Sequence, residues 1–222
     1  MVLAYSEGVA KAFVRLWDKF REIQKCIEDL RPTDPRLDKE RIEATKGGLL
    51  QEAYRWVIET SDFQQWHTSQ HNRLLWIKGD PGKGKTMLLC EFVGQVCTSV
   101  VLLLPGSRIN RATALLRGLI YLLVDQQPSL VSHVQASYDK TGKALFEDAN
   151  AWVALTKIFS SILHDPNLDD TYLIVDALEE CVDDLPRLLD FIAQTSSIST
   201  RVKWVVSSRN WPEIEKTLDT AM

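Results

Sequence analysis

Short runs of apolar residues, each closed by a polar or glycine-bearing stretch, recur along the chain. They cover residues 74–77, 99–104, 172–175 and 202–206. Continuous apolar runs of this length are typical of strands that are buried on both faces of a parallel sheet. We therefore predict four strands, and parallel strands of this kind require helices in the connections between them.

Segments between the runs have apolar residues three and four positions apart, which is the period of an amphipathic helix. After the first run this pattern includes Met87, Leu88, Leu89, Phe92, Val93 and Val96. The same spacing predicts helices at residues 112–124, 129–138 and 149–163. A further helix is predicted around residues 49–58, ahead of the first strand.

Residues 1–30 form a separate amphipathic segment. Its apolar residues alternate in steps of four and three as a heptad seam: Val9, Phe13, Leu16, Phe20, Ile23, Ile27 and Leu30. The seam predicts one long helix that packs either on its own domain or on a partner, through self-association or an effector module. Two prolines then break the helix, so residues 31–48 are predicted to be a linker before a domain at 49–222.

The composition of the chain argues against several classes of function. The chain has 222 residues, 45% of them hydrophobic, enough for a full α/β core, and a formal net charge of -4. Without a long basic run, a nucleic-acid partner has no electrostatic support, and no apolar run is long enough to predict a membrane span. The four cysteines have no metal-ligand spacing, which favours reduced thiols in a cytoplasmic protein.

The octapeptide GDPGKGKT at residues 79–86 carries the strongest chemical signal. It matches the phosphate-binding pattern G-x-x-x-x-G-K-[ST] between a predicted strand and a predicted helix. Glycines let backbone N–H groups curl around phosphates, where a Cβ would obstruct them. Lys85 is placed to reach the β- and γ-phosphates, and Thr86 to ligate Mg²⁺. The predicted nucleotide-binding residues are Gly79, Asp80, Pro81, Gly82, Lys83, Gly84, Lys85 and Thr86.

Charged residues follow the later predicted strands. Asp176 ends the run 172–175, so we expect it beside the phosphate loop as a second magnesium residue with Thr86. Glu179 and Glu180 are candidates to orient or deprotonate an attacking water, the alternative being an acidic pair favoured by a helix N-terminus. Arg209, after the run 202–206, is a candidate to contact the γ-phosphate, and a solvated arginine is the alternative.

With these motifs in order, the chain resembles the NACHT family of signal-transducing P-loop NTPases. It is most similar to fungal members related to vegetative incompatibility proteins and to the nephrocystin-type N-terminal domain. The matching segments lie within residues 36–215: KGGLL, FQQW, LLWIKGDPGKGKTMLL, LRGLIYLLVDQQPSL, YLIVDALEEC and KWVVSSRNWPEIE. The resemblance implies that residues 79–86 are the Walker A loop, Asp176 the Walker B residue, Glu179 and Glu180 its acidic pair, and Arg209 the sensor.

Some positions depart from the family pattern. Residues 90–107 are shorter than the corresponding family stretch and their strand has no aromatic residue. Glu179 stands where the family more often has Asp. The chain ends at Met222, before the later strand and the winged-helix lid of the family, so a C-terminally incomplete domain is expected.

Together these features predict a three-layer α/β P-loop NTPase, a parallel sheet flanked by helices with an N-terminal amphipathic helix. We expect it to bind ATP or GTP with Mg²⁺ as a signalling switch, with slow or no hydrolysis. A small-molecule kinase with the same loop and a non-catalytic interaction fragment remain alternatives. No NKxD guanine-reading motif is present, so the choice between ATP and GTP stays open.

Overall fold

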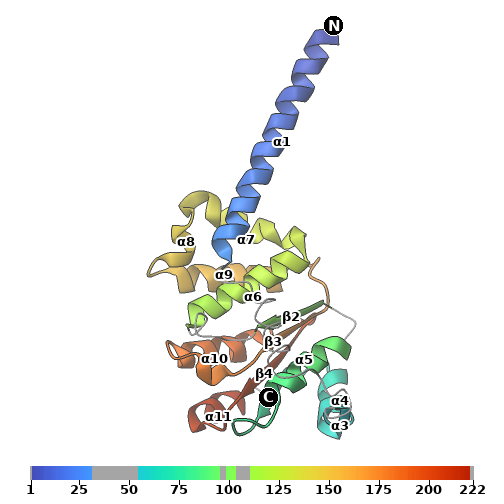
Figure 1. Cartoon of the computed structure of the whole chain (residues 1–222), viewed down its shortest axis with the longest axis vertical. Coiled ribbons are helices and arrows are strands. Elements are labelled where there is room, and N and C mark those ends of the chain that lie inside the picture. The colour runs from blue at the N-terminus through green and yellow to red at the C-terminus, as the bar shows by residue number, and fades with distance from the viewer. Residues whose placement is uncertain (1, 32–54, 96–98, 104–110, 221–222) are drawn as a thin grey trace.

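The computed structural model describes residues 2–31, 55–95, 99–103 and 111–220 as an α/β fold with a four-stranded parallel sheet (Figure 1). The strands are β1 (Leu74–Lys78), β2 (Ser99–Leu103), β3 (Thr171–Val175) and β4 (Val202–Ser208). All four predicted strands are confirmed, and β4 continues through Ser208 instead of ending at Val206. Their order across the sheet is β1-β4-β3-β2.

Strand β4 lies between β1 and β3, and its pairing with both aligns their carboxyl ends. Lys78 of β1 pairs with Ser208, and Val175 of β3 pairs with Val206. Since the strands are parallel, their carboxyl ends meet at one edge of the sheet, where ligands of open α/β sheets usually bind. The topology therefore brings residues 79–86, Asp176 and Arg209, which all follow strand ends, to the same edge.

Helices occupy the connections and flank the sheet (Figure 1). Ahead of β1 lie α3 (Arg55–Ile58) and α4 (Ser61–Thr68), and α5 (Lys85–Gln95) follows β1. Between β2 and β3 lie α6 (Ala112–Gln126), the 3₁₀ turn η2 (Pro128–Leu130), α7 (Val131–Thr141), α8 (Ala144–Glu147) and α9 (Ala151–Leu163). After β3 come the 3₁₀ turn η3 (Leu178–Glu180), α10 (Leu185–Thr195) and, beyond β4, α11 (Pro212–Leu218).

The predicted helices are found with changed ends, and three other helices were not predicted. The helix expected at 129–138 begins only at Val131, because residues 128–130 form a 3₁₀ turn, and it runs on to Thr141. Helices α8, α10 and α11 had no counterpart in the sequence interpretation. The predicted linker beyond residue 31 and most of the helix predicted around residues 49–58 lie outside the described residues.

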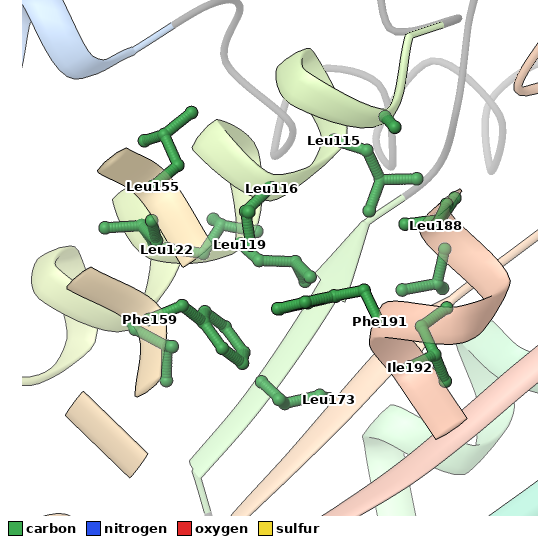
Figure 2. Close-up of a cluster of buried hydrophobic side chains, with 14 of the residues drawn as sticks. Leu115, Leu116, Leu119, Leu122, Leu155, Phe159, Leu173, Leu188, Phe191 and Ile192 are labelled. Atoms are coloured by element: carbon green, nitrogen blue, oxygen red, sulfur yellow. The ribbon is translucent and has the colours of Figure 1, made fainter. Parts of the chain in front are cut away.

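Successive side chains of the buried strands point to opposite faces, and each face has its own core. On one face, leucines of α6 meet Phe159 of α9 and Phe191 of α10 over Leu173 of β3 (Figure 2). Phe159 and Phe191 pack edge to face with ring centroids 5.3 Å apart, and both rings pack against Trp204 of β4. This core holds the three-layer arrangement together on the α6, α9 and α10 side.

The opposite face of the sheet is covered by α4 and α5. Phe63 and Trp66 of α4 and Phe92 of α5 pack against Ile174 and Val205 of the sheet. Nearby, the ammonium of Lys203 in β4 donates to the carbonyls of Trp66, His67 and Ser69 at 2.6, 2.5 and 3.0 Å. These bonds satisfy carbonyls at the end of α4 and fasten that helix to the sheet.

The long helix α1 (Val2–Leu30) has two unlike halves, and it projects from the body in Figure 1. Its last turns are anchored: Cys26 and Leu30 are fully buried, and Tyr138 of α7 donates a hydrogen bond to the Asp29 carboxylate. Arg117 of α6 donates to the carbonyls of Asp29 and Leu30 at 2.8 and 3.2 Å. The final turns of the predicted heptad seam thus pack on the chain's own domain.

Among the described residues, the earlier turns of the seam are exposed, and the ring of Phe20 stacks on Trp17 of the same helix. Val9, Phe13, Leu16 and Phe20 are between 52% and 69% exposed. The two alternatives drawn from the sequence therefore apply to different parts of the helix, and the alternative of a partner stays a prediction for residues 9–20.

Two further observations concern the described residues as a whole. None of their helices combines the length and apolar character that crossing a membrane requires. Cys26, Cys90 and Cys181 are buried, Cys26 and Cys181 are free thiols, and Cys97 lies outside the described residues.

Candidate functional site

The loop at residues 79–86 connects the end of β1 to the first turn of α5. Gly82 and Gly84 have φ angles of +77° and +80°, in the left-handed region that favours glycine. At Gly79, by contrast, an added Cβ would meet only the Cδ of Lys85 at 3.9 Å, an ordinary contact. The loop's own conformation thus requires glycine at 82 and 84 but not at 79, and the expected obstruction of phosphates by a Cβ at 79 stays a prediction.

Lys85, the first residue of α5, folds its side chain back over the loop. Its Nζ donates to the carbonyls of Gly79 and Asp80 at 2.6 and 3.1 Å. An ammonium has three protons, so one donor remains after these two bonds. The positive charge is thereby held between the start of the loop and the N-terminal end of α5, whose dipole also favours an anion.

Thr86 and Asp176, 90 residues apart in the chain, are in direct contact. The Thr86 hydroxyl donates a hydrogen bond to Oδ2 of Asp176 at 2.6 Å. Asp176 is buried, with 4% of the residue exposed. On its other oxygen, Oδ1, the carboxylate accepts a hydrogen bond from the Ser207 hydroxyl. Two hydroxyls from two different elements therefore fix the orientation of this buried carboxylate.

Ser207 is a site residue that sequence reasoning missed. Its hydroxyl also accepts a hydrogen bond from the backbone N of Ala177 at 3.0 Å, and Ser208 beside it accepts one from the Trp76 indole at 2.9 Å. Both serines are fully buried. A polar pair at the end of an apolar strand was the available signal, because buried hydroxyls require partners.

The chemistry of these oxygen atoms fits a magnesium ion. Mg²⁺ prefers hydroxyl and carboxylate oxygens, keeps several waters, and takes few protein ligands when it binds with phosphates. In the part of the chain that the structure describes, no three His, Cys, Asp or Glu side chains converge as a metal cage. Thr86 and Asp176 could hold such an ion only together with water and phosphate oxygens.

Glu179 and Arg209 form an ion pair. The Oε1 of Glu179 lies 3.2 Å from Nε of Arg209, and Oε2 accepts a hydrogen bond from the backbone N of Arg209 at 3.1 Å. The carboxylate is nearly buried, with 7% of its side chain exposed, whereas the arginine side chain is 46% exposed. Arg209 is therefore held in an ion pair while nearly half of its side chain is exposed, and its contact with a γ-phosphate stays a prediction.

Glu180 differs from its neighbour because its side chain is exposed. Partial removal of water raises the pKa of its carboxyl, the charges of Asp176 and Glu179 raise it further, and Arg209 opposes them. Both glutamates belong to η3, a single 3₁₀ turn that follows Ala177, whose φ is +48°. The helix-dipole alternative for the acidic pair has little support, since α10 begins only at Leu185.

The fold and the site together define an α/β protein with a glycine-rich loop, a buried carboxylate and an arginine gathered at one sheet edge. The chain belongs to the family described as nephrocystin 3, N-terminal, whose match covers residues 52–209. All the candidate site residues lie within this match, whereas α1 lies outside it.

Among curated proteins, the chain is 56% identical over 230 aligned residues to the vegetative incompatibility protein HET-E-1 of Podospora anserina. This similarity covers 99% of the chain but only 17% of that relative's length. The ookinete surface protein PIMMS43 of Plasmodium berghei (strain Anka) is 31% identical over 85 residues, 37% of this chain and 24% of that protein. No solved structure matches the chain. The predicted relationship to fungal vegetative incompatibility proteins is confirmed.

Proposed function

We propose that this chain is a nucleotide-binding switch of the P-loop NTPase type, and that it binds ATP or GTP together with Mg²⁺. The observation that carries the proposal is the 2.6 Å hydrogen bond between Thr86 and Asp176. It joins the end of the glycine-rich loop to the acidic end of a second buried strand. This is the pairing that magnesium–phosphate chemistry needs, an oxygen ligand beside the phosphate loop and a carboxylate opposite it.

The other site residues have complementary roles in this proposal. Backbone N–H groups of residues 79–86 would bind phosphate oxygens, and Lys85 would exchange its two carbonyl partners for the β- and γ-phosphates. Thr86 would ligate the ion and Asp176 would hold it through water. When bound, magnesium would neutralise phosphate charge, while Ser207 keeps the Asp176 carboxylate oriented.

We further propose that the chain is the nucleotide-binding part of a NACHT-type signalling protein in the cytoplasm. Its 56% identity to a protein named for vegetative incompatibility supports this context. Hydrolysis is expected to be slow or absent. Of the two candidate bases, Glu179 already uses both carboxylate oxygens on Arg209.

A titration with fluorescent ATP and GTP analogues, with and without Mg²⁺, tests the proposal. For Asp176→Asn we expect a loss of about tenfold or more in Mg²⁺-dependent affinity, as for other metal-positioning residues, and little change without Mg²⁺. Asp190→Asn, an exposed acid on α10, is the matched control and should bind as the parent does. Equal losses in both conditions would remove the metal role of Asp176, and a parent chain that binds neither nucleotide would refute the proposed function.

A further inference from the structure

Arg209 leaves the sheet at the point where the predicted phosphate loop begins. The backbone N of Gly79 donates to the carbonyl of Ser208 at 3.2 Å, and Arg209 is the next residue. On the other side of β4, Val206 pairs with Val175, which directly precedes Asp176. The backbone of Arg209 thus starts between the loop and the Asp176 carboxylate.

Both carboxylate oxygens of Glu179 contact Arg209. The carboxylate contacts the backbone N and the Nε of the same arginine, at 3.1 and 3.2 Å. Among the described residues, neither Nη atom of Arg209 has a hydrogen-bond or ion-pair partner. The arginine is therefore anchored at its inner nitrogen, while the two outer nitrogens of its fork stay available.

A fork held in this manner suits recognition of an oxyanion. A guanidinium offers planar donors that match two oxygens of a phosphate, and an arginine already held in one orientation loses less freedom when it binds. The anchoring group is 7% exposed and the arginine 46% exposed, so the buried carboxylate serves as the fixed end and the cation as the accessible end.

We infer that Glu179 is a positioning residue that orients Arg209 toward the γ-phosphate, and so sets the preference of the site for a triphosphate over a diphosphate. The inference rests on the proposed function and adds the nucleotide specificity of the site. It also separates the two glutamates, because Glu179 has both oxygens engaged on Arg209 whereas Glu180 is exposed. Glu180 is then the remaining candidate to activate water.

The test compares affinities for non-hydrolysable triphosphate and for diphosphate analogues, both with Mg²⁺. The ratio of the two affinities is measured for the parent chain, Arg209→Ala, Glu179→Ala, Glu179→Gln and the double alanine variant. Glu213→Ala removes an exposed acid on α11 and is the matched control for loss of charge near the same strand end. The melting temperature of each variant reports its folding.

We expect Arg209→Ala and Glu179→Ala each to lower the triphosphate preference about fivefold, at unchanged diphosphate affinity. The double variant should show no further loss, since both changes remove the same oriented cation. Glu179→Gln should also lower the ratio, because an amide cannot accept from the two donors of Arg209 with two oxygens. Glu213→Ala should keep the parent's ratio.

Other outcomes are decisive against the inference. A carboxylate that only repels the γ-phosphate would give a higher ratio in both Glu179 variants. Equal losses for both nucleotides, with a lower melting temperature, would make Glu179 structural. An unchanged ratio in Arg209→Ala would remove Arg209 from γ-phosphate recognition. In all three cases the proposed function survives, whereas a parent chain that binds no nucleotide overturns both.

Discussion

Among the described residues, Lys85 hydrogen-bonds through its ammonium to the loop to which it belongs. Its ammonium bonds the carbonyls of Gly79 and Asp80, and it takes no part in either core cluster. We therefore expect Lys85→Ala to abolish detectable nucleotide binding while the melting temperature stays within a few degrees of the parent's. Fluorescent-nucleotide titration and thermal melting measure the two effects, and Lys216→Ala, an exposed lysine on α11, is the control. Parent-like affinity in Lys85→Ala would contradict the phosphate-loop assignment.

The pair His133–Asp165 predicts a pH-dependent contribution to stability. Its nitrogen and oxygen are 2.6 Å apart, and the hydrogen bond from His133, then the one from the Asn167 backbone, lower the pKa of Asp165 below its ordinary 3.8. A carboxyl with a lowered folded pKa stabilises the fold above its unfolded value, and this stability is lost as pH falls through the folded pKa. The contribution should thus be complete near neutral pH and vanish in acid.

Denaturant unfolding of the parent chain and Asp165→Asn measures this effect. The difference in unfolding free energy should be constant from about pH 6 to pH 5 and should shrink as the pH falls below about 4. Asp190→Asn, which changes an exposed acid on α10, should show no such trend. A difference that stays constant into acid would mean that Asp165 acts through shape and not through charge.

Residue-scale chemistry was predictable from the sequence where it is encoded in a contiguous motif. The 79–86 loop and the acid at the end of β3 could be identified in this way. Their contact followed from the rule that parallel strands end at one edge. The roles of Ser207 and Glu179 could not be found, because each depends on a partner about 30 residues away across strands β3 and β4. Their partners follow from the strand order, which local patterns do not contain.

At the scale of elements, the buried strands and the long helices α1, α6 and α9 were predicted from their patterns. The length of strand β4 was underestimated because Ser207 and Ser208 are polar. Their hydroxyls have buried partners, which explains why β4 continues to pair with Ile77 and Lys78. Helix α11 is too short for its periodicity to be recognised, and it is stabilised by burial of Ile214 and Leu218. Helix α10 starts with a proline in its first turn, a signal for a helix start that the sequence interpretation did not use.

The exposed half of α1 predicts association through its apolar face. We expect Phe20→Glu to lower the oligomer mass in light scattering while nucleotide affinity stays unchanged, because a charge placed in an apolar seam opposes burial. Since Phe20 is 52% exposed, the melting temperature of the monomer should change little. Lys11→Gln, an equal change of charge at another exposed site of the same helix, is the control.

The result separates the two packing alternatives for these turns. An unchanged mass with a lower melting temperature would show that residues 9–20 pack on their own chain. Unchanged values of both quantities would show that the exposed seam is solvated.

At the scale of the whole molecule, bound nucleotide should stabilise the fold by mass action. A ligand at about 100 times its dissociation constant adds roughly 2.7 kcal/mol to the free energy of unfolding. For a chain of this size, that corresponds to several degrees in melting temperature. Thermal melting at saturating ATP or GTP with Mg²⁺ measures the shift. Absence of any shift with either nucleotide would favour the interaction-fragment alternative.

The attachment of α1 has a mechanical consequence. Arg117 of α6 binds the last carbonyls of α1. Helix α6 packs on β2, which lies next to β3, the strand that Asp176 follows. A straight helix of 29 residues is about 43 Å long at about 1.5 Å per residue. A tilt of about five degrees at its base therefore displaces its tip by about 4 Å. The first helix would thus act as a lever arm, because a small rotation at its base would produce a larger displacement of its far end.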